Sequence, residues 1–191
     1  MVRIYVVDNG GQWTHREWRV LRDLEVETKI IPNTTTYTEL LKDSIDGLVL
    51  SGGAPRIGLE STLGNCAEYF ENASFPILGI CAGHQYMARF FGGEAKPSKI
   101  PEYGQVELTI LKTDDPLFQG VPDHSIVWES HNDEVTVLPK NFELLAKSAN
   151  CPIQAMKHKK KWFYGLQFHP EVEHTQYGEL MFENFIGFCK E

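Results

Sequence analysis

Residues 76–85 read Pro76-Ile77-Leu78-Gly79-Ile80-Cys81-Ala82-Gly83-His84-Gln85, and they set the architecture expected for the whole chain. The first five are a short apolar run, typical of a strand buried on both faces. Cys81 ends that run, and small residues stand around it at positions 79, 82 and 83. This pattern is typical of a nucleophile elbow, a tight strand-to-helix turn written G-x-C-x-G in place of G-x-S-x-G. We expect the following helix to begin two or three residues after Cys81.

Strand and helix patterns alternate on both sides of this turn. Apolar runs typical of strands cover residues 4–7, 26–31, 47–50 and 76–80. Apolar residues at helical spacing lie between and after these runs, at 13–24, 36–41, 66–70 and 86–91. Thr36 and Glu39 have capping-box spacing at the start of the second helical segment. Apolar strands separated by helices predict a parallel sheet that is covered on both faces.

The second half of the chain has a different pattern. Residues 106–110 alternate between apolar and polar, as in a half-exposed strand. Short strand-like runs follow at 126–128, 135–138, 153–156 and 163–168, and helical spacing returns at 181–189. We therefore predict a single α/β domain over residues 1–191. It is an open, mostly parallel, flavodoxin-like sheet with helices on both faces, plus a small antiparallel flap.

Charge and composition narrow the class of protein. The net charge of −8 over 191 residues disfavours a binder of nucleic acids or anionic membranes. The first apolar run is too short for a signal peptide, and no run reaches the roughly eighteen apolar residues that span a bilayer. These features predict a cytoplasmic protein. The four cysteines include no C-x-x-C pair, so we expect free thiols and no metal site.

The position of Cys81 favours a nucleophile over the alternative, a buried structural cysteine beside a glycine turn. Its thiol is expected at the carboxyl edge of the sheet, where open α/β folds bind ligands. The start of the next helix favours the thiolate form. The backbone N–H of Ala82 would point at an oxyanion that develops on the substrate.

A thiol nucleophile needs a base and a group that orients the base. Gln167-Phe168-His169-Pro170-Glu171 supplies both, because His169 can accept the proton of Cys81. Glu171 lies two residues further on, so an extended backbone puts both side chains on the same side. Alone, this pattern also fits a surface histidine beside a surface glutamate.

A glycine-rich turn, Ser51-Gly52-Gly53-Ala54-Pro55, follows another predicted strand at the same edge of the sheet. Its backbone N–H groups can complete an oxyanion hole, and we expect that of Gly53 to act together with Ala82. The alternative is an ordinary glycine turn.

The segments G-I-C-A-G-H-Q, S-G-G-A-P and Q-F-H-P-E, at these spacings, resemble the class I, or triad, glutamine amidotransferases. The match covers nearly the whole chain and implies that family's fold, with a Cys-His-Glu triad at Cys81, His169 and Glu171. It also implies that Gln85 contacts the substrate glutamine and that four residues hold its amino-acid end: Ser130, His131, Asn132 and Asp133. Without the resemblance, His131 and Asp133 fit a polar loop. Many relatives lack Ala54, which leaves the identity of the oxyanion donor open, and many have glycine in place of Asn132.

Three segments resemble one branch of this family, the glutaminase part of GMP synthases. They are D-N-G-G-Q at 8–12, S-H-N-D-E-V at 130–135 and, above all, H-T-Q-Y-G at 174–178. The chain has no G-x-x-x-x-G-K-[ST] segment. The resemblance therefore implies a two-subunit, archaeal-type enzyme, with no cofactor on this chain and with ATP, Mg²⁺ and XMP bound by a separate ATP-pyrophosphatase subunit.

Three alternatives remain open from the sequence. The first is an amidotransferase subunit with another ammonia acceptor, such as chorismate or a pyrimidine precursor. The second is a cysteine hydrolase with the same elbow, such as a γ-glutamyl hydrolase. The third is a non-catalytic relative, which the intact Cys81, His169 and Glu171 disfavour.

Overall fold

A mixed sheet of nine strands runs through the computed structural model, which describes residues 1–190. The strand order is β2-β1-β3-β4-β9-β8-β7-β5-β6. Its first five strands are β2 (Ile30–Pro32), β1 (Ile4–Asn9), β3 (Gly47–Gly53), β4 (Ile77–Ile80) and β9 (Phe163–Leu166). All neighbours among these five are parallel, in the 2-1-3-4-5 order of a flavodoxin-like sheet with β9 as the fifth strand. The predicted α/β class is therefore confirmed.

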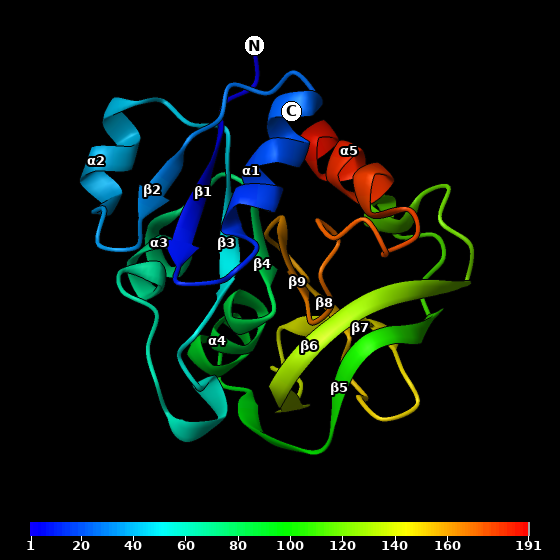
Figure 1. The fold of residues 1–191 in the computed structure, drawn as a ribbon. Helices are drawn as coiled ribbons and strands as arrows, with labels where there is room; N and C mark the ends of the chain where they lie inside the picture. Colours follow the sequence, from blue (N-terminus) through cyan, green and yellow to red (C-terminus); the bar gives the residue numbers. More distant parts are fainter. Residues whose placement is uncertain (191) are drawn as a thin grey trace.

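The other half of the sheet is antiparallel and larger than the flap that the sequence predicted. It consists of β8 (Ala155–His158), β7 (Phe142–Lys147), β5 (Glu94–Ile110) and β6 (His124–Val137). The two longest strands, β5 and β6, lie side by side across the lower right of Figure 1. "Mostly parallel" is thus corrected to about half parallel, because β5 begins well before the alternating residues 106–110 and passes through a register shift between Pro97 and Glu102.

Helices cover both faces of the sheet, as predicted. They are α1 (Thr14–Asp23), α2 (Tyr37–Lys42), α3 (Cys66–Asn72), α4 (Ala82–Phe90) and α5 (Gly178–Phe188), with short 3₁₀ helices η1 (Ile57–Leu59) and η2 (Pro116–Phe118). One apolar core lies under α1 and α5, which are side by side in Figure 1. A second core lies under α2, α3 and α4. Two cores on opposite faces explain why the central strands are apolar throughout.

Two local expectations need correction and one is confirmed. The run 26–31 forms only a short strand, β2, and Glu27 makes no more than an isolated bridge to Arg3, ahead of β1. The run 126–128 and residues 135–137 of the run 135–138 belong to one continuous strand, because β5 pairs with β6 on both sides of the polar residues between them. The capping box at Thr36 is present, with both reciprocal hydrogen bonds to Glu39.

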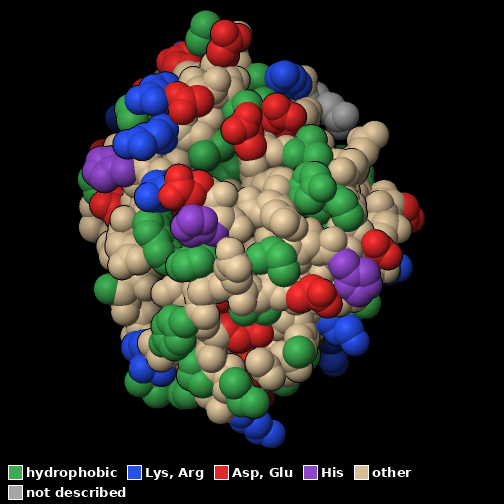
Figure 2. Space-filling view, turned by 45° about the vertical axis from the view of Figure 1, so that its right-hand side comes forward, with side chains coloured by type: hydrophobic (Ala, Val, Ile, Leu, Met, Phe, Trp, Pro, Cys, Tyr) green, Lys and Arg blue, Asp and Glu red, His purple; other side chains and the backbone are tan. Residues whose placement is uncertain are grey.

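None of the helices described within residues 1–190 combines the length and the apolar character that a bilayer-spanning helix needs. Figure 2 shows one face of the molecule, on which acidic and basic side chains are interspersed among apolar and uncharged ones. No broad field of a single charge covers the face shown.

Candidate active site

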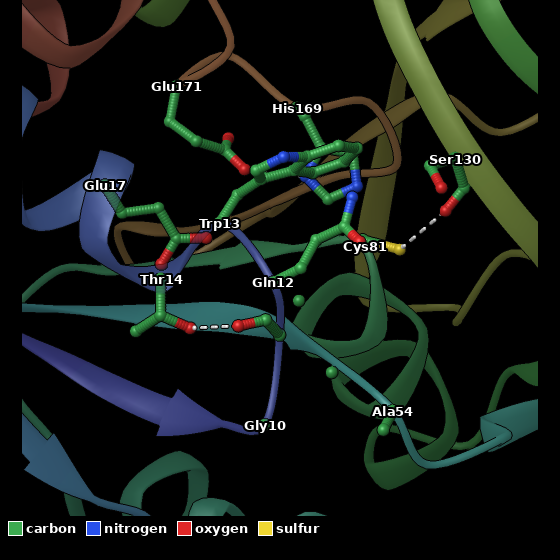
Figure 3. A pocket seen from close by; sticks show the side chains of 13 residues that line it. Gly10, Gln12, Trp13, Thr14, Glu17, Ala54, Cys81, Ser130, His169 and Glu171 are labelled. Atoms are coloured by element: carbon green, nitrogen blue, oxygen red, sulfur yellow. Dashed lines mark hydrogen bonds and ion pairs between the residues drawn. The ribbon is translucent and has the colours of Figure 1, made fainter.

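A cavity of about 240 Å³ opens where the parallel strands end (Figure 3). Its walls come from the turn between β1 and α1, the end of β3, the elbow after β4, strand β6 and the segment after β9. Cys81, His169 and Glu171 all line it. The structure therefore brings together three residues that are separated by up to ninety positions in the sequence.

Cys81 occupies a strained turn between β4 and α4. Its backbone has φ +50° and ψ −104°, a conformation that costs energy for a residue with a side chain. The expected delay before the helix is wrong, because α4 begins at Ala82, directly after the cysteine. A Cβ on Gly83 would lie 2.6 Å from the carbonyl oxygen of Leu50, so the small residues allow α4 to pack closely on β3. The Cys81 thiol faces the carbonyl of Ser130 at 3.9 Å.

His169 and Glu171 form a buried pair, with 2.7 Å between Nδ1 and Oε1. Burial opposes protonation of His169, but Glu171 and the nearby Cys81 sulfur raise its pKa well above the usual 6.5. The indole of Trp13 packs edge-on against the imidazole, with ring centroids 4.5 Å apart, as Figure 3 shows. The imidazole is therefore fixed on two sides and is poised to carry a proton.

The segment H-T-Q-Y-G has a structural role next to this pair. The hydroxyl of Thr175 donates to the carbonyl of His169 at 2.7 Å and accepts from the N–H of Trp128 at 2.9 Å. A Cβ on Gly178 would overlap the carbonyl of Pro170. Thr175 thus ties the histidine backbone to β6, and Gly178 lets α5 start close to it.

Ser51, Gly52 and Gly53 form the end of β3, so the strand runs three residues beyond its predicted end and the expected glycine turn after residue 50 is wrong. This end of β3 lies against the side chains of Cys81 and His169. A Cβ on Gly52 would approach His169 Cε1 at 3.2 Å and Cys81 Cβ at 3.5 Å, so a larger residue there would crowd the site. Gly53 and Ala54 line the cavity. Ala82 is the first residue of α4, and its N–H therefore has no helical partner. The roles of Gly53 and Ala82 as oxyanion donors stay a prediction.

Only Ser130 of the residues expected to bind the substrate lines this cavity. Gln85 is buried, and its Nε2 donates to the carbonyl of Asp133 at 2.7 Å and to Oε1 of Gln167 at 3.0 Å. Within residues 1–190, Oε1 of Gln85 makes no hydrogen bond of its own. A contact of Gln85 with glutamine would therefore use that oxygen.

The side chains of Asp133 and Asn132 are also engaged. Arg56 holds the carboxylate of Asp133 with two hydrogen bonds of 2.9 and 2.6 Å, and the N–H of Gly58 adds a third at 3.1 Å. Asn132 accepts from the hydroxyl of Tyr103. The polar-loop alternative is wrong, because these residues lie inside β6, where the segment containing η1 packs against them.

His131 sits in a buried network of carboxyl groups. Its Nδ1 donates to the carbonyl of Asp133 at 2.9 Å, and its Nε2 is 3.0 Å from Oε2 of Glu102 and 3.6 Å from Oε2 of Glu129. Burial lowers its pKa, but the two carboxyl groups outweigh burial and raise it above 6.5. Burial raises the pKa of Glu129 to about 8, and neither of its oxygens has a hydrogen-bond partner within residues 1–190. Because both ring nitrogens face acceptors, His131 is held in its charged form.

One group of side chains in this network has the composition of a metal site. The ligand atoms of Glu102, His131 and Cys151 lie within 4.8 Å of one another. However, both nitrogens of His131 are donors in this arrangement, and the Cys151 thiol donates to the carbonyl of Ile153 at 3.8 Å. The group is therefore a hydrogen-bonded network, since a bound metal would need the lone pair of a ring nitrogen.

The other three cysteines differ from Cys81 in their surroundings. Cys66, Cys151 and Cys189 are buried free thiols, and none of them lines the cavity. Burial raises the pKa of all three, to about 12 for Cys66 and Cys189. A buried thiol with a raised pKa is inert, so Cys81 is the one cysteine positioned for chemistry.

Two residues in the wall of the cavity were not predicted from the sequence. They are Trp13, against His169, and Glu17, whose side chain is 1% exposed and has an unpartnered Oε2 within residues 1–190. Burial, and then the neighbouring Glu171, raise the pKa of Glu17 well above its usual value. Trp13 is the N-cap residue of α1, and Glu17 and Leu21 follow it at intervals of four residues, so an acid within this apolar spacing was the available signal.

Replacing Glu129 by glutamine should flatten the dependence of stability on pH. Folded Glu129 keeps its proton up to about pH 8, whereas the unfolded chain loses it near 4.5, so the free energy of unfolding falls as pH rises through this window. His131 acts in the same direction, because its stabilisation is complete below 6.5 and is lost as pH rises through its raised pKa. The measurement is urea denaturation between pH 5 and 8.5. Over this range the free energy of unfolding of the wild type should fall by a few kcal/mol more than that of the variant, since a tenfold change in proton affinity is worth ~1.4 kcal/mol. Glu107→Gln, at an exposed position on β5, should keep the wild-type slope; equal slopes in all three proteins would contradict the prediction.

Comparison with known proteins identifies the family of this chain. The family model "Glutamine amidotransferase class-I" matches residues 5–188. The chain belongs to the class I glutamine amidotransferases. Among its relatives, the A subunit of the glutamine-hydrolyzing GMP synthase of Thermoplasma acidophilum is 53% identical over 190 residues, which is 99% of this chain and 94% of that protein. The protein of the same name from Pyrococcus abyssi is 50% identical over 98% of this chain and 99% of its own length.

Solved structures extend the comparison. A crystal structure of a Thermoplasma acidophilum protein, 52% identical, superposes with a TM-score of 0.93 over 100% of this chain and 94% of that one. A glutamine amidotransferase from Thermotoga maritima, at 20% identity, superposes with a TM-score of 0.71 over 99% of this chain and 82% of its own, and it shows the fold alone. The predicted amidotransferase fold is thus confirmed.

Proposed function

We propose that this chain is the glutaminase subunit of a two-subunit GMP synthase, which hydrolyses glutamine and delivers the ammonia to a separate subunit. The observation that carries the proposal is the meeting of Cys81, on its strained elbow, with the buried pair of His169 and Glu171 in one cavity. The full-length similarity to proteins named as the A subunit of GMP synthase supports the choice of acceptor.

The reaction begins when His169 takes the proton of Cys81 and the thiolate attacks the side-chain carbonyl carbon of glutamine. The raised pKa of His169 supports this role, because an imidazolium beside Glu171 is stable enough to form. The tetrahedral oxyanion then lies within reach of the N–H groups of Gly53 and Ala82, by the expectation from the sequence.

His169 next returns its proton to the departing nitrogen, and the carbon–nitrogen bond breaks to release ammonia. This leaves a γ-glutamyl thioester on Cys81. Water, deprotonated by His169, attacks the thioester carbonyl, and the thiolate leaves to give glutamate. His169 then holds the proton from that water and can return it to the sulfur, so the cycle closes without a cofactor on this chain.

The ammonia acceptor lies on another chain in this proposal. The partner binds ATP and Mg²⁺ and adenylates XMP, and ammonia displaces AMP to give GMP. The names of the relatives, each of them an A subunit, support the existence of a second, partner subunit. We also propose, from the family, that the isolated chain is a poor glutaminase that the partner and its nucleotides activate.

The decisive experiment joins this chain with the ATP-pyrophosphatase subunit from the same organism, by co-expression and co-purification. GMP should form from glutamine, ATP, Mg²⁺ and XMP when both subunits are present and not with either one alone. Failure of the pair to form GMP, with glutamine hydrolysis intact, would instead favour another acceptor. Turnover of γ-glutamyl peptides in preference to free glutamine would favour a γ-glutamyl hydrolase.

A further inference from the structure

Gln167 contacts the sulfur that performs the proposed reaction. It directly follows β9, and its side chain is fully buried. Its Nε2 donates to the Sγ of Cys81 at 3.6 Å, and its backbone N–H donates to the carbonyl of Gln154 at 2.8 Å. The side chain is therefore anchored at its base and ends at the nucleophile.

The direction of the Gln167 amide follows from its neighbours. The carbonyl of Asp133 can only accept, so the group of Gln85 that faces it at 2.7 Å must be the NH₂. The second hydrogen of that NH₂ needs an acceptor, which Oε1 of Gln167 supplies at 3.0 Å. The NH₂ of Gln167 is then the group left to face Cys81. A backbone carbonyl in β6 thus orients two amides in sequence and presents an N–H to the sulfur.

We propose that Gln167 is a catalytic residue that stabilises the Cys81 thiolate by donating a hydrogen bond to it, and that Gln85 is the positioning residue that keeps this donor directed at the sulfur. This inference rests on the proposed function, because it concerns the nucleophile of that reaction. No proton moves to or from Gln167: the thiol proton goes to His169, and the amide remains neutral throughout.

The N–H of Gln167 would assist two steps of the proposed glutamine hydrolysis. A hydrogen bond to an ionised acceptor is stronger than one to a neutral acceptor, so the donor favours thiolate over thiol. The same bond favours thiolate as the leaving group when water attacks the thioester. It is therefore used twice, once when the sulfur attacks and once when it departs.

Three ionisable groups also face Cys81. His169 and Glu171 come from the segment after β9, and Glu17 comes from α1. They are present in the wild type and in every variant proposed below. A difference between the wild type and a Gln167 variant therefore reports the amide.

The test measures the rate at which iodoacetamide alkylates Cys81 in the full chain, without glutamine, between pH 5 and 10. In Gln167→Met, the half-maximal rate should move to a pH about 1 higher, which is about a tenfold smaller thiolate population at lower pH. The plateau rate at high pH should not fall, because a more basic thiolate is a stronger nucleophile. Mass spectrometry assigns the adduct to Cys81.

Gln154→Met is the matched control. Gln154 is also fully buried, but its Nε2 donates to Glu102 at 2.8 Å and to Ser148 at 3.2 Å instead of to the sulfur. It should keep the wild-type profile. The inference is overturned if Gln167→Met leaves the half-maximal pH unchanged, or if both variants shift it equally.

Two further variants keep the inference testable if Gln167→Met does not fold. Gln167→Glu keeps the shape and turns an oxygen toward the sulfur, so it should raise the half-maximal pH at least as much. Gln85→Met frees the Gln167 amide to rotate, and it should shift the profile in the same direction by a smaller amount. An unshifted profile in Gln167→Glu overturns the role of Gln167, and one in Gln85→Met overturns that of Gln85. Because the assay contains neither glutamine nor a partner, its failure is distinguishable from failure of the proposed function.

Discussion

Cys81→Ala is expected to abolish glutamine hydrolysis while ammonia-dependent GMP synthesis by the assembled pair survives. Without the sulfur no thioester can form, and a loss of about 10³-fold or more is typical when a covalent nucleophile is removed. Alanine is smaller than cysteine and suits the tight elbow, so the fold and the docking of the partner should persist. The measurements are glutamate release, and GMP formation with glutamine or with ammonium chloride as the nitrogen source.

Cys189→Ala serves as the control, because this buried thiol lies at the end of α5, away from the cavity. It should hydrolyse glutamine at close to the wild-type rate. Glutaminase activity that survives in Cys81→Ala at the wild-type rate would show that another group is the nucleophile. Loss of the ammonia-dependent reaction as well would show that the substitution disturbs the complex.

Glu171→Gln should lower kcat for glutamine hydrolysis by about 10²–10⁴-fold and change KM little. The carboxylate accepts from Nδ1 of His169 at 2.7 Å, which fixes the tautomer and stabilises the imidazolium that forms during the reaction. An amide of the same shape can present an N–H to that nitrogen and select the other tautomer. Steady-state glutaminase kinetics with the activated complex are the measurement.

Glu173→Gln is the matched control for this substitution. Its side chain is two residues further on and 72% exposed, so the variant should retain wild-type kinetics. The pH profile of kcat adds a second readout, because the acid that holds the pKa of His169 well above its usual range is lost in Glu171→Gln. Equal kinetics in the two variants would remove Glu171 from the triad.

The pattern of apolar residues along the sequence predicted the parallel half of the fold. Strands β1, β3, β4 and β9 are apolar because both of their faces are covered, and this makes them visible as short runs. The extent of the antiparallel half could not be predicted from the same pattern. Polar residues 129–134 interrupt the apolar pattern of β6, and only the pairing with β5 across the sheet keeps that strand continuous.

The candidate site divides in the same way. The motifs around Cys81 and His169 could be recognised in the sequence because each is local. An elbow needs small residues next to the nucleophile, and an acid two residues from a histidine can orient the imidazole. The sequence did not predict roles for Glu17, Trp13 and Gln167. Their places beside the candidate site come from contacts between segments that are distant in the sequence. Thr175 falls between these two cases. In the sequence it belongs to the segment that resembles the GMP synthase branch of the family, but only the structure shows its hydrogen bond to the carbonyl of His169.

The sequence by itself determined the family and predicted the nucleophile and its base, because these depend on residue types at short spacings along one chain. The tertiary structure alone decided how these groups are held: the carbonyl of Asp133 orients Gln85, Gln85 orients Gln167, and Gln167 donates to Cys81. The physical reason is that a hydrogen bond has a direction as well as a length. Direction is set by strands that are distant in sequence and adjacent in space, and no spacing along the chain records it.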